Sequence, residues 1–241
     1  TSLSGTADIV KYDFGYEIDP VWEAGNKNIP GIYIEFKEPW LNPKGFEQIV
    51  YDVLANTQDM NIIEKPEPED TPFYINNGTI NVGSTNGKVI LQTFSLESLV
   101  RVAEVFQGKV PMCFLLWKGT GATDLTYDDP LGYASFINLG VKYKAHFIGP
   151  CIAGAPNDYP ELDQPWQDYL IHRAKMKNHP YTFDTYDQMA KYFGQYNFGV
   201  ADGMFNPPYL DALFTNHSDM SINYMITHGW RKSPASQTLV D

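Results

Sequence analysis

The sequence predicts a single α/β domain built on a parallel sheet, and three observations lead to that fold class. Short runs rich in β-branched and aromatic residues alternate with longer stretches of helical periodicity along the chain. A chain of 241 residues suits one large domain, and its 43% hydrophobic residues can fill a sizeable core. Repeated strand–helix alternation is typical of parallel βα units, which close into a barrel or form an open, doubly wound sheet.

The N-terminal half contains three clear strand signals with helices between them. The apolar run 31–37 predicts a strand, and apolar residues at helical spacing predict an amphipathic helix over roughly 43–57. The run 89–94 predicts the next strand, and Ser95 is a suitable N-cap for a following helix. A third apolar run at 110–117 predicts the next strand of the sheet.

The C-terminal half continues the same alternation. Apolar residues there recur at helical spacing between short β-type runs. The predicted elements are a helix near 129–141, a strand at 146–150, a helix over 163–177, a strand at 179–183, a helix capped by Asp184, a strand at 212–215 and a helix over 218–227.

Three segments fall outside this alternation within the single predicted domain, 1–241. Residues 60–87 form a polar connection too long for a plain loop, which predicts an excursion from the domain. Residues 198–210 form an insertion before the last strand, and residues 228–241 are expected to be a C-terminal tail.

Composition excludes several classes of partner. The chain has 17 basic and 29 acidic residues, a net charge of −12, and no basic stripe. This balance argues against nucleic-acid binding, which requires phosphate neutralisation, and against docking on anionic membranes. No apolar stretch is long enough to span a bilayer. The chain begins without Met or a signal peptide, so we expect that its natural start has been removed.

Two further features bear on the cellular compartment. Cys113 and Cys151 lie far apart without metal-ligand spacing, and two buried free thiols are favoured over a disulfide. Asn77 begins an Asn-Gly-Thr sequon in a polar, loop-like stretch, which is a candidate glycosylation site. The sequon favours a secreted protein, extracellular or periplasmic.

Five motifs resemble, in order, those of glycerophosphodiester phosphodiesterases, especially the bacterial periplasmic type, over roughly residues 5–227. They are IYIEFKEPW at 32–40 (family YPEIKxPW), LQTF at 91–94 (LQxF), IGP at 148–150, HPYT at 179–182, and LFTNHSD at 213–219 (LFTDFPD). The resemblance implies a (β/α)8 TIM barrel with its active site at the carboxyl ends of the strands. It also implies hydrolysis of glycerophosphodiesters as the family activity.

The resemblance further implies a site for a divalent cation, calcium or magnesium, held by three carboxylates. Residues 7–14, ADIVKYDF, resemble the second barrel strand, which reads ADxxExD in the family. Asp13 takes the place of the family Asp, and Glu35 that of the third-strand Glu. Lys11 stands at the remaining ligand position, where its ammonium is expected to pair with the carboxylates in place of the metal. On this interpretation the cofactor is either such a cation or none.

The family's paired histidines have no counterpart in the chain. The first strand with its His-Arg-Gly motif is absent, so the barrel is expected to be incomplete. About seventeen residues separate Asp13 from Gly31, where the family carries a long insertion with a second histidine. No catalytic residue is therefore identified, and we expect a catalytically impaired or inactive site.

Three residues of the matched strands are expected near the barrel mouth. A carboxylate within an apolar strand is costly to bury, so Glu35 should face the mouth rather than the core. Gln92 should face it too. Lys37 shares the face of Glu35 and is either a phosphate contact or an ordinary rim lysine. A salt bridge between Lys37 and Glu35 is not expected, because alternate residues are offset along the pleat.

Other aromatic residues and imidazoles complete the set of candidates. Trp117 ends its strand and could wall the pocket, although packing is the simpler role. The resemblance makes His179 and Tyr181 pocket residues, but not a proton-transfer pair. Three histidines belong to no motif and are expected to be incidental: His146, His172 and His228.

Three functional hypotheses remain open. One is a glycerophosphodiester phosphodiesterase-like protein with impaired catalysis that takes a small glycerophosphodiester or related ligand. Another is a degenerate relative serving as an extracellular binding, storage or structural protein. The last is an active enzyme whose N-terminal segment lies on another chain or is missing from the sequence. A second chain or segment that completes the barrel is the expected partner.

Overall fold

The structure is a computed structural model, and it describes residues 32–56, 89–117, 127–196 and 210–228. Lys11, Asp13 and Asn77 lie outside the described residues. So do the predicted excursion at 60–87 and nearly all of the insertion at 198–210.

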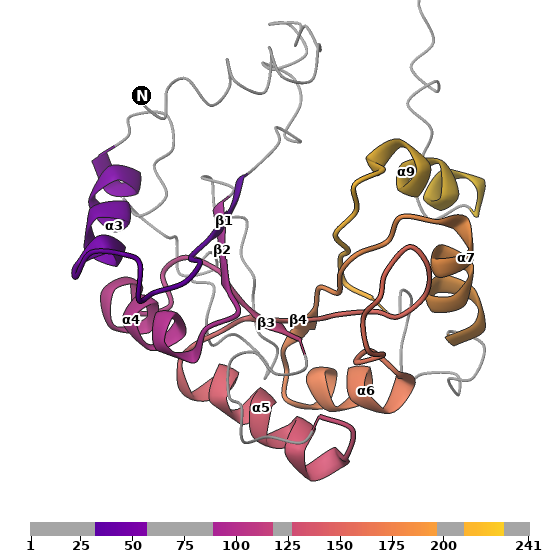
Figure 1. Ribbon diagram of the computed structural model, residues 1–241, viewed down its shortest axis with the longest axis horizontal. Helices are drawn as coiled ribbons and strands as arrows, with labels where there is room; N and C mark the ends of the chain where they lie inside the picture. The colour runs from indigo at the N-terminus through magenta and orange to yellow at the C-terminus, as the bar shows by residue number, and fades with distance from the viewer. Residues whose placement is uncertain (1–31, 57–88, 118–126, 197–209, 229–241) are drawn as a thin grey trace, which may run out of the picture.

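Five parallel strands form one sheet whose spatial order follows the chain. This arrangement confirms the predicted α/β class with a parallel sheet, because each strand lies beside its neighbour in sequence. Figure 1 shows helices arranged in an arc around these strands. The strands are β1 (Ile32–Glu35), β2 (Val89–Thr93), β3 (Met112–Leu116), β4 (Phe147–Pro150) and β5 (Lys177–Asn178).

The helices follow the strands as the periodicity indicated. Ser95 caps α4, as predicted, and its hydroxyl accepts a hydrogen bond from the Ser98 amide at 3.4 Å. Asp129 caps α5 by accepting from the Gly132 amide at 2.9 Å. The helices are α3 (Phe46–Asn56), α4 (Leu96–Phe106), α5 (Pro130–Lys142), α6 (Pro165–Arg173), α7 (Tyr186–Met189), the π-helical η4 (Ala190–Gln195) and α9 (Ser218–Thr227).

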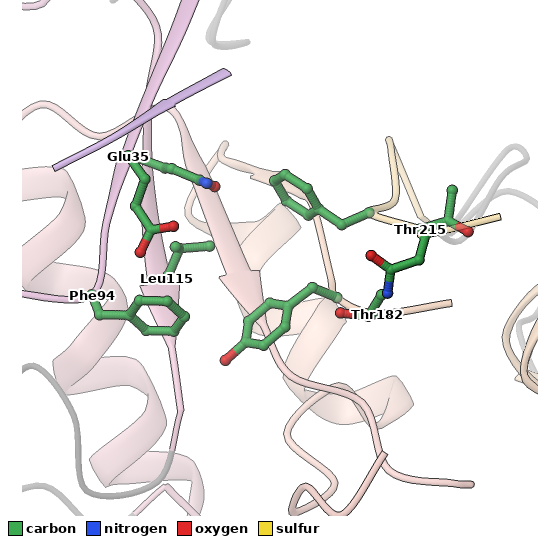
Figure 2. A pocket seen from close by; sticks show the side chains of 9 residues that line it. Glu35, Phe94, Leu115, Thr182 and Thr215 are labelled. Carbon is green, nitrogen blue, oxygen red and sulfur yellow. The ribbon is translucent and has the colours of Figure 1, made fainter. Parts of the chain in front are cut away.

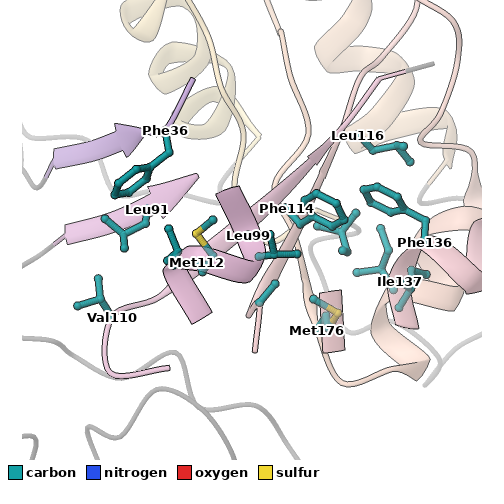
Figure 3. Close-up of a cluster of buried hydrophobic side chains, with 14 of the residues drawn as sticks. Phe36, Leu91, Leu99, Val110, Met112, Phe114, Leu116, Phe136, Ile137 and Met176 are labelled. Atoms are coloured by element: carbon teal, nitrogen blue, oxygen red, sulfur yellow. The ribbon is translucent and has the colours of Figure 1, made fainter. Parts of the chain in front are cut away.

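The strands β3 and β4 are buried on both faces of the sheet, whereas β1 is half-buried. On its helix-covered face, Phe114 of β3 stacks on Phe136 of α5 with ring centroids 4.3 Å apart, at the centre of the main apolar cluster (Figure 3). On the opposite face, Cys113 and Leu115 of β3 pack with Phe147 of β4 in a second cluster. Burial on both sides is typical of parallel sheets and explains why these strands read as continuous apolar runs.

The two cysteines match their prediction. Cys113 and Cys151 are both buried, and both are free thiols. Within the part of the chain that the structure describes, no helix has the length and apolarity to cross a membrane.

Two predicted strands take a less regular form. The strand β5 (Lys177–Asn178) lies just before the predicted strand 179–183 and includes the last residue of the helix predicted over 163–177. Beyond it, the His179 and Tyr181 amides still donate to the Ile148 and Pro150 carbonyls at 2.9 and 3.0 Å, and Tyr181 forms an isolated bridge to Cys151. Residues 212–215 receive no strand assignment either. They nevertheless run beside residues 178–183, with the Phe214 amide donating to the Pro180 carbonyl at 2.9 Å. Residues 212–215 therefore lie beside this segment without forming a regular ladder.

The predicted N-cap Asp184 is wrong by one residue. Thr185 caps α7, and its hydroxyl accepts from the Gln188 amide at 3.2 Å. The Asp184 carboxylate instead accepts from the backbone amide and the side-chain amide of Asn216, each at 2.9 Å. The Asp184 oxygen atoms that could have capped the helix are thus occupied by Asn216, which is distant in sequence.

Gly149 permits the close packing of the inner layer, and its substitution tests that packing. A Cβ at Gly149 would lie 2.7 Å from a Leu115 methyl carbon and 2.9 Å from the Cys113 sulfur. We expect Gly149→Ala to lower the free energy of unfolding by about 1–3 kcal/mol, as overpacking does. Urea unfolding would measure it.

Gly194→Ala is the matched control, because the nearest atom to its added Cβ is the Tyr224 hydroxyl at 4.0 Å. This variant should be neutral or more stable by up to about 1 kcal/mol. Equal stability of the two variants would contradict the tight inner layer.

Candidate functional site

A pocket of about 270 Å³ opens at the carboxyl ends of the first three strands. Glu35 ends β1, Gln92 is the last residue but one of β2, and Leu115 holds the same place in β3. Figure 2 shows Glu35 and Phe94 on one side of the pocket and Thr182 and Thr215 on the other. The lining residues are Glu35, Gln92, Phe94, Leu115, Tyr181, Thr182, Phe214, Thr215 and Asn216.

Glu35 is the carboxylate of this pocket. Its Oε1 is buried and accepts no hydrogen bond from any described residue. Burial raises the pKa of Glu35, and the nearby Lys37 ammonium offsets part of that rise. The side chain therefore binds a proton more readily than a solvated glutamate does.

Lys37 does form the ion pair with Glu35 that the sequence argued against. Its Nζ lies 3.8 Å from Glu35 Oε1. The reason is that β1 ends at Glu35, so Lys37 lies beyond the pleat that would have kept the two side chains apart. The lysine side chain is 73% exposed, and a pair so open to solvent contributes at most about 1 kcal/mol.

Gln92 supplies a second polar atom beside Glu35. The two residues are register partners on adjacent parallel strands. Gln92 Oε1 is also buried without a hydrogen-bond partner among the described residues. Glu35 Oε1 has the Lys37 ammonium at 3.8 Å, whereas Gln92 Oε1 has no such partner in the described part of the chain, and a donor or a cation beside it would offset the cost of burying an acceptor.

Aromatic rings form the apolar walls. Phe94 and Tyr181 meet edge to face with centroids 5.7 Å apart, and the Tyr181 hydroxyl donates to the Leu116 carbonyl at 3.0 Å. Phe214 packs edge to face on Tyr33 at 4.9 Å. Burial raises the pKa of Tyr181, so its hydroxyl remains protonated and serves as a fixed wall.

His179 lies in the packed layer and does not line the pocket. Its ring stacks on Phe147 with centroids 4.0 Å apart, and its Nδ1 lies 3.1 Å from the Tyr33 hydroxyl. Burial lowers the pKa of His179 to about 4, so the ring is neutral near neutral pH. It therefore supports the pocket wall rather than contacting the cavity.

Trp117 also lies away from the lining residues. Its side chain is 42% exposed, and its ring meets Tyr159 edge to face at 6.0 Å. Tyr159 in turn contacts Tyr181, so Trp117 lies one residue layer beyond the pocket wall.

Asn216 takes the place of the family Asp in the LFTNHSD motif and lies in the far wall of the pocket, whereas the other residues of that wall, Thr182, Phe214 and Thr215, were not predicted from the sequence. These residues belong to the HPYT and LFTN motifs, which were the available signal. Their approach to Glu35 depends on contacts between segments far apart in the chain, and no local pattern reports such contacts.

His172 is not incidental, contrary to expectation. Its Nδ1 lies 3.0 Å from Asp168 Oδ2, and its Nε2 lies 2.7 Å from Asp211 Oδ2. Both carboxylates raise the pKa of His172, to about 9, against the opposing effect of burial. The periodicity of α6 placed His172 on a helix but could not show that Asp211, 39 residues away, would meet it.

The other two histidines have structural contacts. His146 is buried, and its Nδ1 accepts from the Met112 amide at 3.0 Å. Burial lowers the pKa of His146 to about 3. The His228 ring stacks on Tyr224 at 4.0 Å. Neither is among the residues that line the pocket.

The oxygen atoms of Glu35 and Gln92 suit a hard divalent cation, which prefers oxygen ligands. They are too few to hold one alone. Within the described residues, no cluster of three His, Cys, Asp or Glu side chains could hold a metal ion. The remaining predicted ligand, Asp13, and the competing Lys11 lie outside those residues.

Comparison with known proteins identifies a shared fold. No protein-family model and no curated protein sequence matches the chain. A crystal structure assigned as a glycerophosphoryl diester phosphodiesterase from Silicibacter pomeroyi DSS-3 matches with a TM-score of 0.55 and 10% identity. The match covers 88% of this chain and 55% of that one, so the chain spans about half the length of its structural neighbour. At this identity the similarity shows the fold alone.

A second solved structure is a Schiff-base-forming fructose-1,6-bisphosphate aldolase. It matches with a TM-score of 0.35 and 9% identity, over 77% of this chain and 86% of that one. A similarity of this size carries no argument about fold or function.

The buried carboxylate predicts a pH-dependent cost to stability. Because the folded-state pKa of Glu35 is raised, stability is highest when Glu35 is protonated and falls as the pH rises above the unfolded value. We expect Glu35→Gln to be more stable than the parent near neutral pH, by up to about 1 kcal/mol. The difference in free energy of unfolding between parent and variant should become small near pH 4, because the Glu35 carboxyl is then mostly protonated and neutral, like the Gln amide.

Urea unfolding of parent and variant across this range measures the effect. Glu104→Gln on the exposed face of α4 serves as the control and should change nothing at either pH. A Glu35→Gln variant less stable than the parent near neutral pH would show that the carboxylate is satisfied after all.

Proposed function

We propose that the chain is a glycerophosphodiester phosphodiesterase-like protein that binds a glycerophosphodiester, or a related ligand, with impaired hydrolysis. One observation carries this proposal. Residues from four of the five family-like motifs, widely separated in sequence, line a single pocket. They are Glu35 of IYIEFKEPW, Gln92 and Phe94 of LQTF, Tyr181 and Thr182 of HPYT, and Phe214 to Asn216 of LFTN.

The proposal includes closure of the sheet into a barrel. The described sheet ends at β1 on one side, and residues 210–216 follow β5 on the other. We expect residues 7–14 to pair beside β1, as the motif resemblance implies. A second chain or segment would fill the position of the first family strand, since an open barrel exposes unpaired strand edges.

The described lining supports impaired rather than full catalysis. Hydrolysis of a phosphodiester requires proton transfer to the leaving alkoxide and stabilisation of phosphoryl charge. None of the nine lining residues is a histidine, and Glu35 is their sole carboxylic acid. Of the two motif histidines, His179 is packed against Phe147 with a lowered pKa, and His217 follows the lining residue Asn216 but is not itself a lining residue.

A divalent cation, calcium or magnesium, would be held by Glu35, Gln92 and Asp13. When bound, such a cation neutralises charge on the phosphoryl oxygens. Lys11 would compete with it by placing an ammonium among the same carboxylates. An extracellular or periplasmic location, with glycosylation at Asn77, belongs to the same proposal.

The role of Lys11 can be tested by restoring the family's carboxylate. We expect Lys11→Glu to bind calcium or magnesium where the parent binds neither. The bound ion should raise the free energy of unfolding by about 2–3 kcal/mol at a hundredfold excess over its dissociation constant. Thermal unfolding with each ion, and with a chelator, would measure the gain.

Two control variants separate the effect of adding a metal-binding carboxylate from the effect of removing the Lys11 ammonium. Lys11→Met removes the ammonium without adding an oxygen ligand and should gain less than Lys11→Glu. Lys11→Glu combined with Glu35→Gln should lose the response. Tight divalent binding by the parent chain would contradict the proposed role of Lys11.

Binding of glycerophosphocholine tests the function itself. We expect saturable binding by calorimetry and slow or undetectable release of choline. Gln92→Ala should weaken binding about tenfold, because the ligand loses a hydrogen bond to Gln92 Oε1 worth roughly 1.4 kcal/mol. Glu104→Gln, outside the pocket, should bind like the parent.

The outcomes separate the three hypotheses. Release of choline that a chelator abolishes would favour the active enzyme and contradict impaired catalysis. Saturable binding without release supports the proposal. Absence of binding by a folded parent chain would overturn the assignment of the pocket to this ligand and favour a degenerate relative with another role.

A further inference from the structure

A buried charged cluster lies outside the pocket, where α6 meets β5 and residue 211. His172 stands at its centre, with a carboxylate oxygen at hydrogen-bond distance from each ring nitrogen. Asp168, on the same helix, is fully buried, and the Asp211 side chain is 18% exposed. We name these three residues, with Lys177 and Asn178, the Asp211 clasp.

The geometry requires His172 to carry two protons on its ring. Burial raises the pKa of Asp168, and its hydrogen bonds with His172 and Asn178 oppose that rise. While both carboxylates are ionised they can only accept, so each ring nitrogen must donate. Neutral imidazole has one N–H and could satisfy only one of Asp168 and Asp211. The imidazolium satisfies both, which agrees with the raised pKa of His172, about 9.

The groups around His172 come from each element packed against it. Lys177 of β5 pairs with Asp211 Oδ1 at 2.8 Å, and the Asn178 amide donates to Asp211 Oδ2 at 2.8 Å. The Asn178 side-chain amide donates to both Asp168 and the buried Asp163, each at 2.8 Å. These donors hold the pKa of Asp211 below its usual value, despite burial.

Asp211 begins the segment that forms the far wall of the pocket. Three residues later, Phe214 donates its amide to Pro180 and accepts at its carbonyl from the Phe183 amide at 2.8 Å. Phe214, Thr215 and Asn216 then line the pocket. Asp211 therefore anchors the chain just before the residues that form the far wall of the pocket.

We propose that protonated His172 positions the Phe214–Asn216 wall of the pocket by holding Asp211. The inference rests on the proposed function only in taking this pocket as the ligand site. Asp211 and His172 are positioning residues, because neither contacts the cavity. Loss of one ring proton leaves a single N–H for two carboxylates. Buried Asp168 has one other donor, the Asn178 side-chain amide, whereas Asp211 keeps Lys177 and the Asn178 backbone amide. The remaining N–H is therefore better placed toward Asp168, and the bond from His172 to Asp211 is the one that is lost.

The pH direction follows from linkage. A histidine whose folded-state pKa is raised stabilises the fold fully below its unfolded pKa, about 6.5, and that stability is lost as the pH rises through about 9. The wall should therefore be held at neutral pH and released under alkaline conditions.

Fluorine NMR of 4-fluorophenylalanine at Phe214 tests the proposal without any assay of activity. In the parent we expect the resonance to titrate with a midpoint within about one unit of pH 9. The same label at Phe136, in the main core, is the control and should not titrate over this range. An untitrated Phe214 resonance in the folded parent would overturn the proposal.

Two variants test whether His172 is the titrating group. His172→Gln should show the released Phe214 resonance at neutral pH and no midpoint. Asp168→Asn leaves the imidazolium with one carboxylate, so the midpoint should move to lower pH. A Phe214 midpoint unchanged in both folded variants would assign the titration to another group and overturn the inference.

Glycerophosphocholine affinity, measured by calorimetry across the same pH range, separates the two proposals. Affinity that falls together with the Phe214 titration supports both. A Phe214 titration without glycerophosphocholine binding at any pH supports the clasp and contradicts the proposed ligand. Affinity that stays constant while the wall is released would show that the wall does not contribute to binding, and would overturn the positioning role.

Discussion

The arrangement of this molecule depends on a parallel sheet whose central strands, β3 and β4, are buried on both faces. Phe114 packs toward the helices, while Cys113 and Leu115 pack into the opposite layer with Phe147. Neither face can accept an unpaired charge at low cost. Polar side chains of the strands are therefore tolerated mainly at the carboxyl ends, where Glu35 and Gln92 meet the cavity. The position of the pocket follows from this burial.

Much of this arrangement could be predicted from the sequence. Continuous apolar runs located β1 to β4, and helical periodicity located the helices between them. A carboxylate inside such a run, Glu35, indicated a mouth-facing residue, because a core position would have left it unpaired. These predictions depend on local pattern and on the cost of burying charge, and a single sequence reports both.

Contacts between distant segments could not be predicted. Lys37 reaches Glu35 because the strand ends earlier than its apolar run, and strand ends are poorly marked in sequence. His172 meets Asp211, and Asp184 meets Asn216, across 39 and 32 residues. Periodicity fixes the face of a helix on which a residue lies, but not which partner the tertiary fold brings there.

The shortness of β5 has an evolutionary consequence. Lys177 and Asn178 bind Asp211 on one side, while the next residue, His179, packs against Phe147 on the other. Three consecutive residues thus contact both the Asp211 clasp and the packed layer around Phe147. A substitution at any of them is expected to disturb both sets of contacts. Mutational effects in residues in direct contact are rarely additive. Along a lineage, changes in this tripeptide should therefore be accepted in combination, and this short stretch should restrict how freely the cavity can diverge to new ligands.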